Sequence, residues 1–200
     1  MKAGKTIGKK IKSMKDKFSE ELVQLAENDL LMREKLLAIN KLSDGYNPEM
    51  EKVHKENAQR LKEIIKEIGF PTISTVGEKA SDAAWLIVQH SIAEPEFMKS
   101  SYKLMLENSA DVNLKHLAFL FDRIQFFQGK PQKFGTQLNS DGTIYPVINK
   151  NEINGLRKKN HLPELTQEKI DSILPIESIE FIENQNAEYI IWRKKVGWKK

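Results

Sequence analysis

Apolar side chains recur at steps of three and four residues along most of this chain, and proline and glycine divide these stripes into separate segments. Such spacing places the apolar residues on one face of an α-helix. The first stripe consists of Ile7, Ile11, Met14, Phe18, Leu22, Leu25 and Leu30. Further helices are predicted over residues 48–68, 77–89, 95–106, 113–128, 152–160 and 166–173. The pattern therefore predicts a mostly α-helical fold.

The helical pattern breaks after Pro131. Alternating apolar residues flank a turn at Asn139–Gly142, in which glycine supplies a positive φ. We therefore expect a small β-hairpin over about residues 133–148, after the central helices.

A chain of 200 residues is most simply one compact domain with appendages. The cluster of turn formers at residues 43–48 marks the clearest break. We divide the chain into a basic amphipathic helical arm at 1–46, a core domain at 47–175 and a basic C-terminal segment at 176–200. The last segment mixes helix-like and strand-like signals, so its structure stays open.

The two ends of the chain carry its positive charge. Residues 1–17 hold seven lysines and one aspartate, and residues 193–200 hold five basic residues and no acid. The formal net charge is only +4, so the body between them is acidic. A basic body that binds nucleic acid is thereby excluded. The basic ends remain candidates for contact with an anionic membrane or nucleic acid, although a helix that packs on its own domain is the commoner case.

The composition excludes several classes of protein. No apolar run approaches the ~20 residues needed to span a bilayer, and no apolar stretch near the start suits a secretory signal. The absence of cysteine rules out disulfides, thiolate metal sites and a cysteine nucleophile. We expect a soluble cytoplasmic protein, with no cofactor indicated and the oligomeric state undetermined.

His90 ends a helix that is apolar almost all round from Ala83 to Val88. It is either a general acid or base at the edge of a pocket or a packed imidazole with a satisfied hydrogen bond. Glu78 and Asp82 could approach it to form a metal site, but their i, i+4 spacing is more typical of a solvated helix face. We therefore assign no metal site.

Asp122 and Arg123 lie among phenylalanine and leucine residues within the helix predicted over 113–128. A buried charge needs a partner, and neighbouring residues on a helix point about 100° apart, so each must reach elsewhere. Two interpretations are open. Asp122 could orient a catalytic base while Arg123 binds a phosphate or carboxylate, or both could hold nearby loops through charge-assisted hydrogen bonds.

The segment Gly129–Gln137 contains two glutamines, a threonine and two glycines. Gln132, Thr136 and Gln137 suit the recognition of a polar ligand, or alternatively the capping of backbone groups within a structured loop. The spacing matches neither a P-loop nor a dinucleotide fingerprint.

Several motifs together carry a family resemblance: Gly69-Phe-Pro-Thr-Ile-Ser-Thr-Val-Gly-Glu-Lys-Ala-Ser81, Ala84-Trp-Leu-Ile-Val-Gln-His90, Leu120-Phe-Asp-Arg-Ile124, Gly129-Lys-Pro-Gln-Lys-Phe-Gly-Thr-Gln137 and Asn154-Gly-Leu-Arg-Lys-Lys-Asn-His-Leu-Pro-Glu-Leu165. The chain resembles a bacterial domain-of-unknown-function family, number six-six-two-four, over about residues 48–165. Phe134 stands where the family has an aromatic residue, often tyrosine. The resemblance implies no assigned reaction, cofactor or catalytic residue.

Two hypotheses for function follow. In the first, the protein is a small-molecule enzyme or ligand-binding domain for an anionic or phosphate-bearing ligand. His90 and Asp122 would then be catalytic, while Arg123, Gln132, Thr136 and Gln137 bind the ligand. In the alternative, the protein is a non-catalytic interaction module. The same residues would form a buried structural network, and the basic ends would contact an acidic partner.

Overall fold

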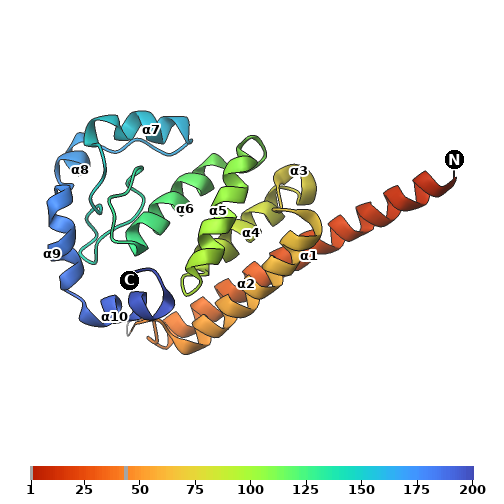
Figure 1. Cartoon of the computed structure of the whole chain (residues 1–200), viewed down its shortest axis with the longest axis horizontal. Helices are drawn as coiled ribbons and strands as arrows, with labels where there is room; N and C mark the ends of the chain where they lie inside the picture. Colours follow the sequence, from red (N-terminus) through yellow and green to blue (C-terminus); the bar gives the residue numbers. More distant parts are fainter. Residues whose placement is uncertain (1, 43–44) are drawn as a thin grey trace. The chain divides into compact units, whose positions relative to one another are not determined.

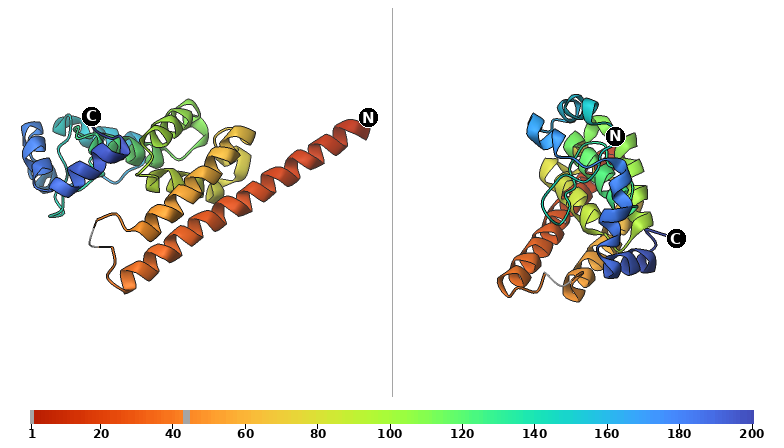
Figure 2. Two further views of the ribbon diagram at one scale, coloured as in Figure 1. Left: turned by 60° about the horizontal axis from the view of Figure 1, so that its bottom comes forward. Right: turned by 90° about the vertical axis from the view of Figure 1, so that its left-hand side faces the viewer.

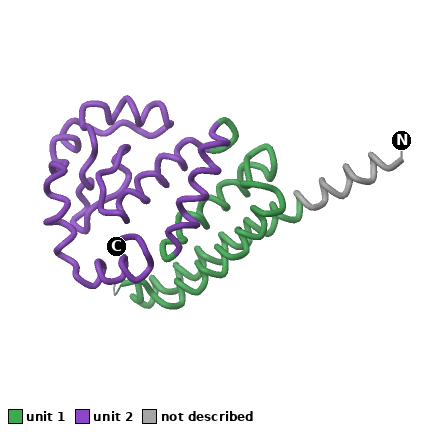
Figure 3. Tube along the Cα trace, viewed as in Figure 1, with its two compact units in different colours: residues 1–93, 110–112 green, residues 94–109, 113–200 purple. Residues whose placement is uncertain are grey.

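The chain is mostly helical, as the sequence predicts. The computed structural model describes residues 2–42 and 45–200, with side chains from residue 16 onward, and contains ten α-helices within those ranges. The chain forms two compact units (Figure 3): residues up to 93 with 110–112, called unit 1, and residues 94–109 with 113–200, called unit 2. No helix in the described ranges is both long and apolar enough to cross a membrane.

Unit 1 is built on a pair of antiparallel helices that lie side by side (Figures 1 and 2). Asn47 begins the second helix, since its side chain accepts hydrogen bonds from two backbone N–H groups of the first turn. Gly69 ends that helix at a positive φ of 73°. The helices of this unit are α1 (Lys2–Ala38), α2 (Pro48–Ile68), α3 (Ile73–Val76) and α4 (Glu78–His90).

The core of unit 1 lies where α1, α2 and α4 meet. Alanine residues at the contacts, such as Ala58 and Ala84, let the helix backbones approach closely. The buried stripe of α1 runs through Phe18, Leu22, Ala26, Asp29 and Leu36. Leu30, which the sequence placed in the stripe, is 43% exposed. The stripe therefore includes a carboxylate where a leucine was expected.

Unit 2 begins with two packed helices and continues through short helices and loops. Residues 176–200, whose structure the sequence left open, are largely helical. The helices are α5 (Pro95–Glu107), α6 (Leu114–Phe127), α7 (Ile153–Lys159), α8 (Gln167–Asp171), α9 (Ile179–Asn184) and α10 (Ala187–Val196). The short 3₁₀ turns are Ser109–Asp111, between α5 and α6, then Lys150–Glu152 and Ile176–Ser178.

The three domains predicted from the sequence stay a prediction. The two compact units of the structure divide the chain at other residues. The helix of the predicted N-terminal arm packs on α2, α3 and α4 of unit 1. Residues 94–109 and 113–175 of the predicted core domain share unit 2 with the C-terminal segment.

The predicted hairpin over 133–148 is wrong. Residues 2–42 and 45–200 contain no β-strand, and this segment forms only isolated bridges, between Gln132 and Val147 and between Leu138 and Ile144. Phe134, Ile144 and Val147 are nevertheless buried, and the last two pack with Ile153, whereas Leu138 is 55% exposed. Alternation therefore identified most of the buried residues of this segment but did not identify a strand.

In this segment, side chains accept hydrogen bonds from backbone N–H groups that would otherwise be available to pair with a neighbouring strand. The Asp122 carboxylate accepts hydrogen bonds from the backbone N–H groups of Lys133, Phe134 and Thr136 at 2.8–3.1 Å and from the Thr136 hydroxyl at 3.0 Å. Gln132 Oε1 accepts from the backbone N–H groups of Thr136 and Gln137 at 2.9 and 2.8 Å. The loop is thus organised around two polar side chains.

We predict that Asp122→Asn destabilises the protein by about 3 kcal/mol, because the new amide N–H₂ faces N–H donors that need an acceptor. Urea denaturation of the variant would measure the loss. Asp171→Asn is the matched control, since that carboxylate is exposed and bonds only Gln167. Equal stability of the two variants would contradict this account of the loop.

Candidate functional site

The residues predicted as one site are divided between the two units. His90 ends α4 in unit 1, whereas Asp122, Arg123, Gln132, Thr136 and Gln137 belong to unit 2. The carboxylate that holds His90 is Asp29 and not Asp122. The structure brings Asp122, Gln132, Thr136 and Gln137 together, but on the loop described above.

The hydrogen-bonding groups of Asp122 and Gln132 are used within that loop. The Gln132 Nε2 group donates to the backbone carbonyls of Gln137 and Tyr145, so both ends of this side chain have partners. Burial raises the pKa of Asp122, and hydrogen bonds from the loop oppose that shift. This geometry favours the structural alternative for these residues. Their binding of a ligand stays a prediction.

The histidine cluster consists of Asp29, His54 and His90, one residue from each long helix of unit 1. His90 Nδ1 lies 3.0 and 3.1 Å from the two oxygens of Asp29. His54 Nε2 lies 3.3 Å from Asp29 Oδ2. The Asp29 side chain is 1% exposed, that of His54 10% and that of His90 18%. The cluster therefore opens to solvent mainly at His90.

Tyr46 fixes the orientation of His54. Its hydroxyl lies 2.6 Å from His54 Nδ1, and the two rings stack with centroids 5.7 Å apart. The ring of His54 also lies 5.2 Å from that of His90. Both imidazoles are thus held by contacts on more than one side.

Asp29 is a carboxylate at neutral pH despite its burial. Burial alone raises its pKa, but the interactions with His54 and His90 outweigh that effect and lower the pKa to about 2. The cluster therefore presents one negative charge and two imidazoles at a shared point. Such a set can orient a proton-transferring histidine or bind a metal ion.

The arginine cluster, in unit 2, consists of Arg123, Tyr145, Tyr189 and Arg193. The Arg193 guanidinium carbon lies 4.4 Å from the centre of the Tyr189 ring. Tyr189 interacts electrostatically with Arg123, and Tyr145 interacts in the same way with Tyr189 and Arg193. These contacts bring side chains from α6, α10 and the loop between α6 and α7 into one group.

Buried polar atoms of the arginine cluster lack hydrogen-bond partners. They are Arg123 Nε, Arg193 Nε and Nη2, and the hydroxyls of Tyr145 and Tyr189. Buried polar groups in proteins nearly always have a partner, so each exception needs an explanation. Here the unsatisfied donors belong to one group of residues.

Positive charge exceeds negative charge in the arginine cluster. Arg193 Nη1 donates to Glu183 Oε1 at 2.5 Å and to the carbonyl of Phe127 at 3.3 Å. Lys199 also pairs with Glu183. Glu183 is therefore shared by two cations, while Arg123 forms no ion pair with any described residue.

Burial lowers the pKa of Arg123 to about 10, although the nearby Tyr189 opposes this shift. Burial also raises the pKa of Tyr145 and of Tyr189 above the ordinary value for tyrosine. Both hydroxyls are therefore protonated at neutral pH and can donate hydrogen bonds.

Gly129 makes room for Glu183. Gly129 has a positive φ of 67°, and a Cβ there would lie 2.6 Å from both carboxylate oxygens. Any larger side chain would displace the carboxylate that pairs with Arg193. The sequence had placed Gly129 after the helix over 113–128, at the start of the segment Gly129–Gln137, and gave it no role beside Glu183.

Sequence reasoning missed Asp29 and His54 in the histidine cluster and Tyr145, Tyr189 and Arg193 in the arginine cluster. A usable signal exists for the first two. Asp29 follows the buried Ala26 by three residues, and His54 follows the buried Met50 by four, so both occupy helical stripes. For Arg193 no such signal exists, since the apolar pattern of α10 is irregular.

The basic ends are only partly described. The side chains of residues 1–15 lie outside the described part, so contact of residues 1–17 with an anionic partner stays a prediction. At the other end, Arg193 is buried and Lys199 pairs with Glu183. The remaining basic side chains of residues 193–200, those of Lys194, Lys195 and Lys200, are exposed.

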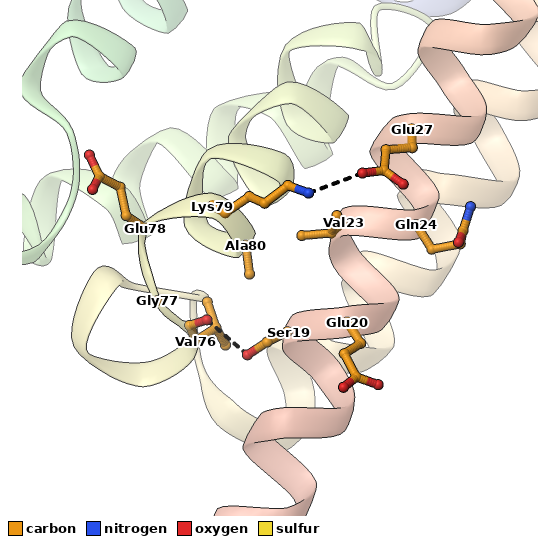
Figure 4. A pocket seen from close by; sticks show the side chains of 10 residues that line it. All are labelled: Ser19, Glu20, Val23, Gln24, Glu27, Val76, Gly77, Glu78, Lys79 and Ala80. Carbon is orange, nitrogen blue, oxygen red and sulfur yellow. Dashed lines mark hydrogen bonds and ion pairs between the residues drawn. The ribbon is translucent and has the colours of Figure 1, made fainter.

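A shallow hollow of about 560 Å³ lies between α1 and the start of α4 (Figure 4). Three glutamates line it, and its single lysine, Lys79, reaches across to Glu27 at 3.1 Å. None of the residues predicted from the sequence as a site lines this hollow. Its acidic lining does not suit an anion.

A family model described as "Family of unknown function (DUF6624)" matches residues 16–173. This match confirms the resemblance seen in the sequence. The matched range includes the whole histidine cluster, together with Arg123 and Tyr145, whereas α9 and α10 lie beyond it. Comparison with curated proteins found no match, and comparison with solved structures found none either.

We predict that Asp29→Ala destabilises the protein by about 3 kcal/mol, because His90 loses its hydrogen-bond partner and the buried His54 loses the carboxylate beside it. Urea denaturation followed by circular dichroism measures the change. Asp16→Ala, an exposed position on the same helix, is the control and should shift stability by less than about 0.5 kcal/mol. A loss at Asp29 no larger than that of the control would refute the role given to this carboxylate.

Proposed function

We propose for this chain, which belongs to the DUF6624 family of unknown function, that it is a ligand-binding domain for a small anionic molecule. The arginine cluster is the binding site, and phosphate or carboxylate is the chemical group that it recognises. The observation that carries this proposal is the set of unsatisfied buried donors around Arg123 and Arg193.

Charge supports an anion over a neutral ligand. Arg123, Arg193 and Lys199 are cations, and Glu183 is the one carboxylate paired with them. Leaving a charge buried without a partner costs several kcal/mol. An anion that reaches Arg123 supplies the missing charge.

The donor types support an oxyanion in particular. A guanidinium presents N–H groups in a planar fork that matches the oxygens of a phosphate or carboxylate. The hydroxyls of Tyr145 and Tyr189 add two further donors beside the arginines. Together they offer several hydrogen bonds to one multi-oxygen group.

Aromatic rings border the arginine cluster. The Phe126 ring lies 4.9 Å from that of Tyr145 and 6.3 Å from that of Tyr189. Trp192 stacks on Tyr189 at 5.9 Å. Rings of this kind suit contact with the carbon part of a small organic anion. Arg123 and Tyr189 are half-buried, so part of each side chain is accessible to solvent.

Arg123 is still the anion-binding residue, as the sequence predicted, but the other ligand-binding residues are different. Gln132 has its donors and acceptor occupied by the loop backbone. The tyrosine hydroxyls and Arg193 take over the role that the sequence gave to Gln132, Thr136 and Gln137.

We predict that phosphate, pyrophosphate or a nucleoside monophosphate raises the melting temperature of the wild-type protein. A ligand at one hundred times its Kd stabilises a fold by about 2.7 kcal/mol. Arg123→Met should abolish this shift, whereas the exposed Arg33→Met should retain it. A thermal-shift series over ligand concentration measures the effect.

Tyr145→Phe serves as the conservative variant, because it keeps the buried ring and removes only the hydroxyl. Its affinity for the same ligand should fall about 5- to 10-fold, as expected for one hydrogen bond. Ligand shifts that are the same in wild type, Arg123→Met and Tyr145→Phe would contradict the proposed site.

A further inference from the structure

We propose that the histidine cluster of Asp29, His54 and His90 is a binding site for a divalent transition metal ion of the zinc type. This site lies in unit 1 and is separate from the anion site proposed in unit 2. The inference stands on the geometry of three side chains and does not depend on the proposed function.

The ligand atoms are spaced as they are around a metal ion. One carboxylate oxygen and one ring nitrogen from each histidine all lie within 4.8 Å of one another. The shared oxygen, Asp29 Oδ2, lies 3.1 Å from His90 Nδ1 and 3.3 Å from His54 Nε2. Zinc binds such atoms at about 2.0–2.2 Å, which places the ligand atoms of a tetrahedral site about 3.3–3.6 Å apart, so small side-chain shifts would open the cluster to an ion.

His54 Nε2 supplies a second, independent observation. It is buried and has no hydrogen-bond partner, even though Asp29 Oδ2 lies 3.3 Å away. The ring is therefore not aligned to donate a good hydrogen bond to that oxygen. An ion between the two atoms would accept the nitrogen lone pair and explain this arrangement.

Tyr46 supports the same interpretation. Its oxygen lies 2.6 Å from His54 Nδ1 and can accept the proton of that nitrogen. Histidine ligands in metal sites almost always use their second ring nitrogen in such a bond, which fixes the ring and the tautomer. His54 Nε2 is then left with its lone pair directed at the cluster.

The ligand types select the class of metal. Two imidazoles and one carboxylate suit zinc, iron, nickel or copper, whereas calcium and magnesium prefer oxygen ligands. Three protein ligands leave a coordination position for water or a substrate, as in catalytic zinc sites and unlike closed structural sites. The side chain of His90, the most exposed of the three, indicates where that position is reached.

The scaffold suits metal binding, because each ligand comes from a different long helix. Asp29 lies on α1, His54 on α2 and His90 at the end of α4, and these helices pack against one another. Ligands on packed helices are held more precisely than ligands on loops. All three also fall within residues 16–173, the range that matches the family model.

Isothermal titration of the full-length, chelator-treated protein with zinc tests the proposal. We expect one zinc ion per chain with a Kd of micromolar or tighter, and cobalt should bind with visible absorption bands. Asp29→Asn and His90→Gln should each weaken zinc binding at least 100-fold. His161→Gln is the matched control, because this histidine is exposed and lies outside the cluster, and it should bind as wild type does.

Circular dichroism establishes whether each variant folds. A second measurement uses only the wild-type protein, so it tests the proposal even when a variant fails to fold. In wild-type protein labelled with ¹⁵N, zinc should shift the ring nitrogens of His54 and His90 and leave those of His116 and His161 unchanged. The proposal is overturned by wild type that binds no stoichiometric zinc, by folded cluster variants that bind it normally, or by shifts confined to His116 and His161.

Discussion

The buried carboxylate of Asp29 is the interaction on which the rest of unit 1 depends. It lies on the core face of α1 and contacts one histidine from α2 and one from α4. A buried charge is costly unless it is paired, so these three helices must pack in the register that brings the histidines to it. Apolar contacts alone would tolerate small shifts of one helix along another. The polar cluster specifies one arrangement.

Much of the fold could be predicted from the sequence, because its helices are delimited by local signals. Asn47 and Pro48 start α2, Gly69 ends it, and Gly129 follows α6, all as side-chain and backbone preferences dictate. What escaped prediction were the polar residues inside. Asp29 and Arg193 occupy core positions that a hydrophobic pattern treats as exposed. The histidines beside Asp29 lie 25 and 61 residues along the chain, and the Phe127 carbonyl that Arg193 binds lies 66 residues away. Only the folded structure supplies those partners.

In the loop after α6 the sequence pattern predicted too much regular structure, since it indicated a β-hairpin where the chain forms only isolated bridges. Most of its apolar residues are buried, though not Leu138, but Asp122 and Gln132 bind backbone N–H groups of the segment that a neighbouring strand would need. Arg157 from α7 then binds the carbonyls of Phe134 and Gly135. Side chains thus bind many of the backbone groups of this segment, while backbone hydrogen bonds such as that from the Tyr145 N–H to the Gln137 carbonyl remain isolated. The polar residues Gln132 and Thr136 of the family motif bind within this loop.

The most direct test of the account is a crystal structure of the protein grown with zinc, with anomalous scattering measured at the zinc absorption edge. We expect one strong anomalous peak, at about 2.0–2.2 Å from each of three atoms: an Asp29 oxygen, His54 Nε2 and His90 Nδ1. A map with zinc elsewhere on the chain, and with Asp29 bonded directly to both histidines, would contradict it.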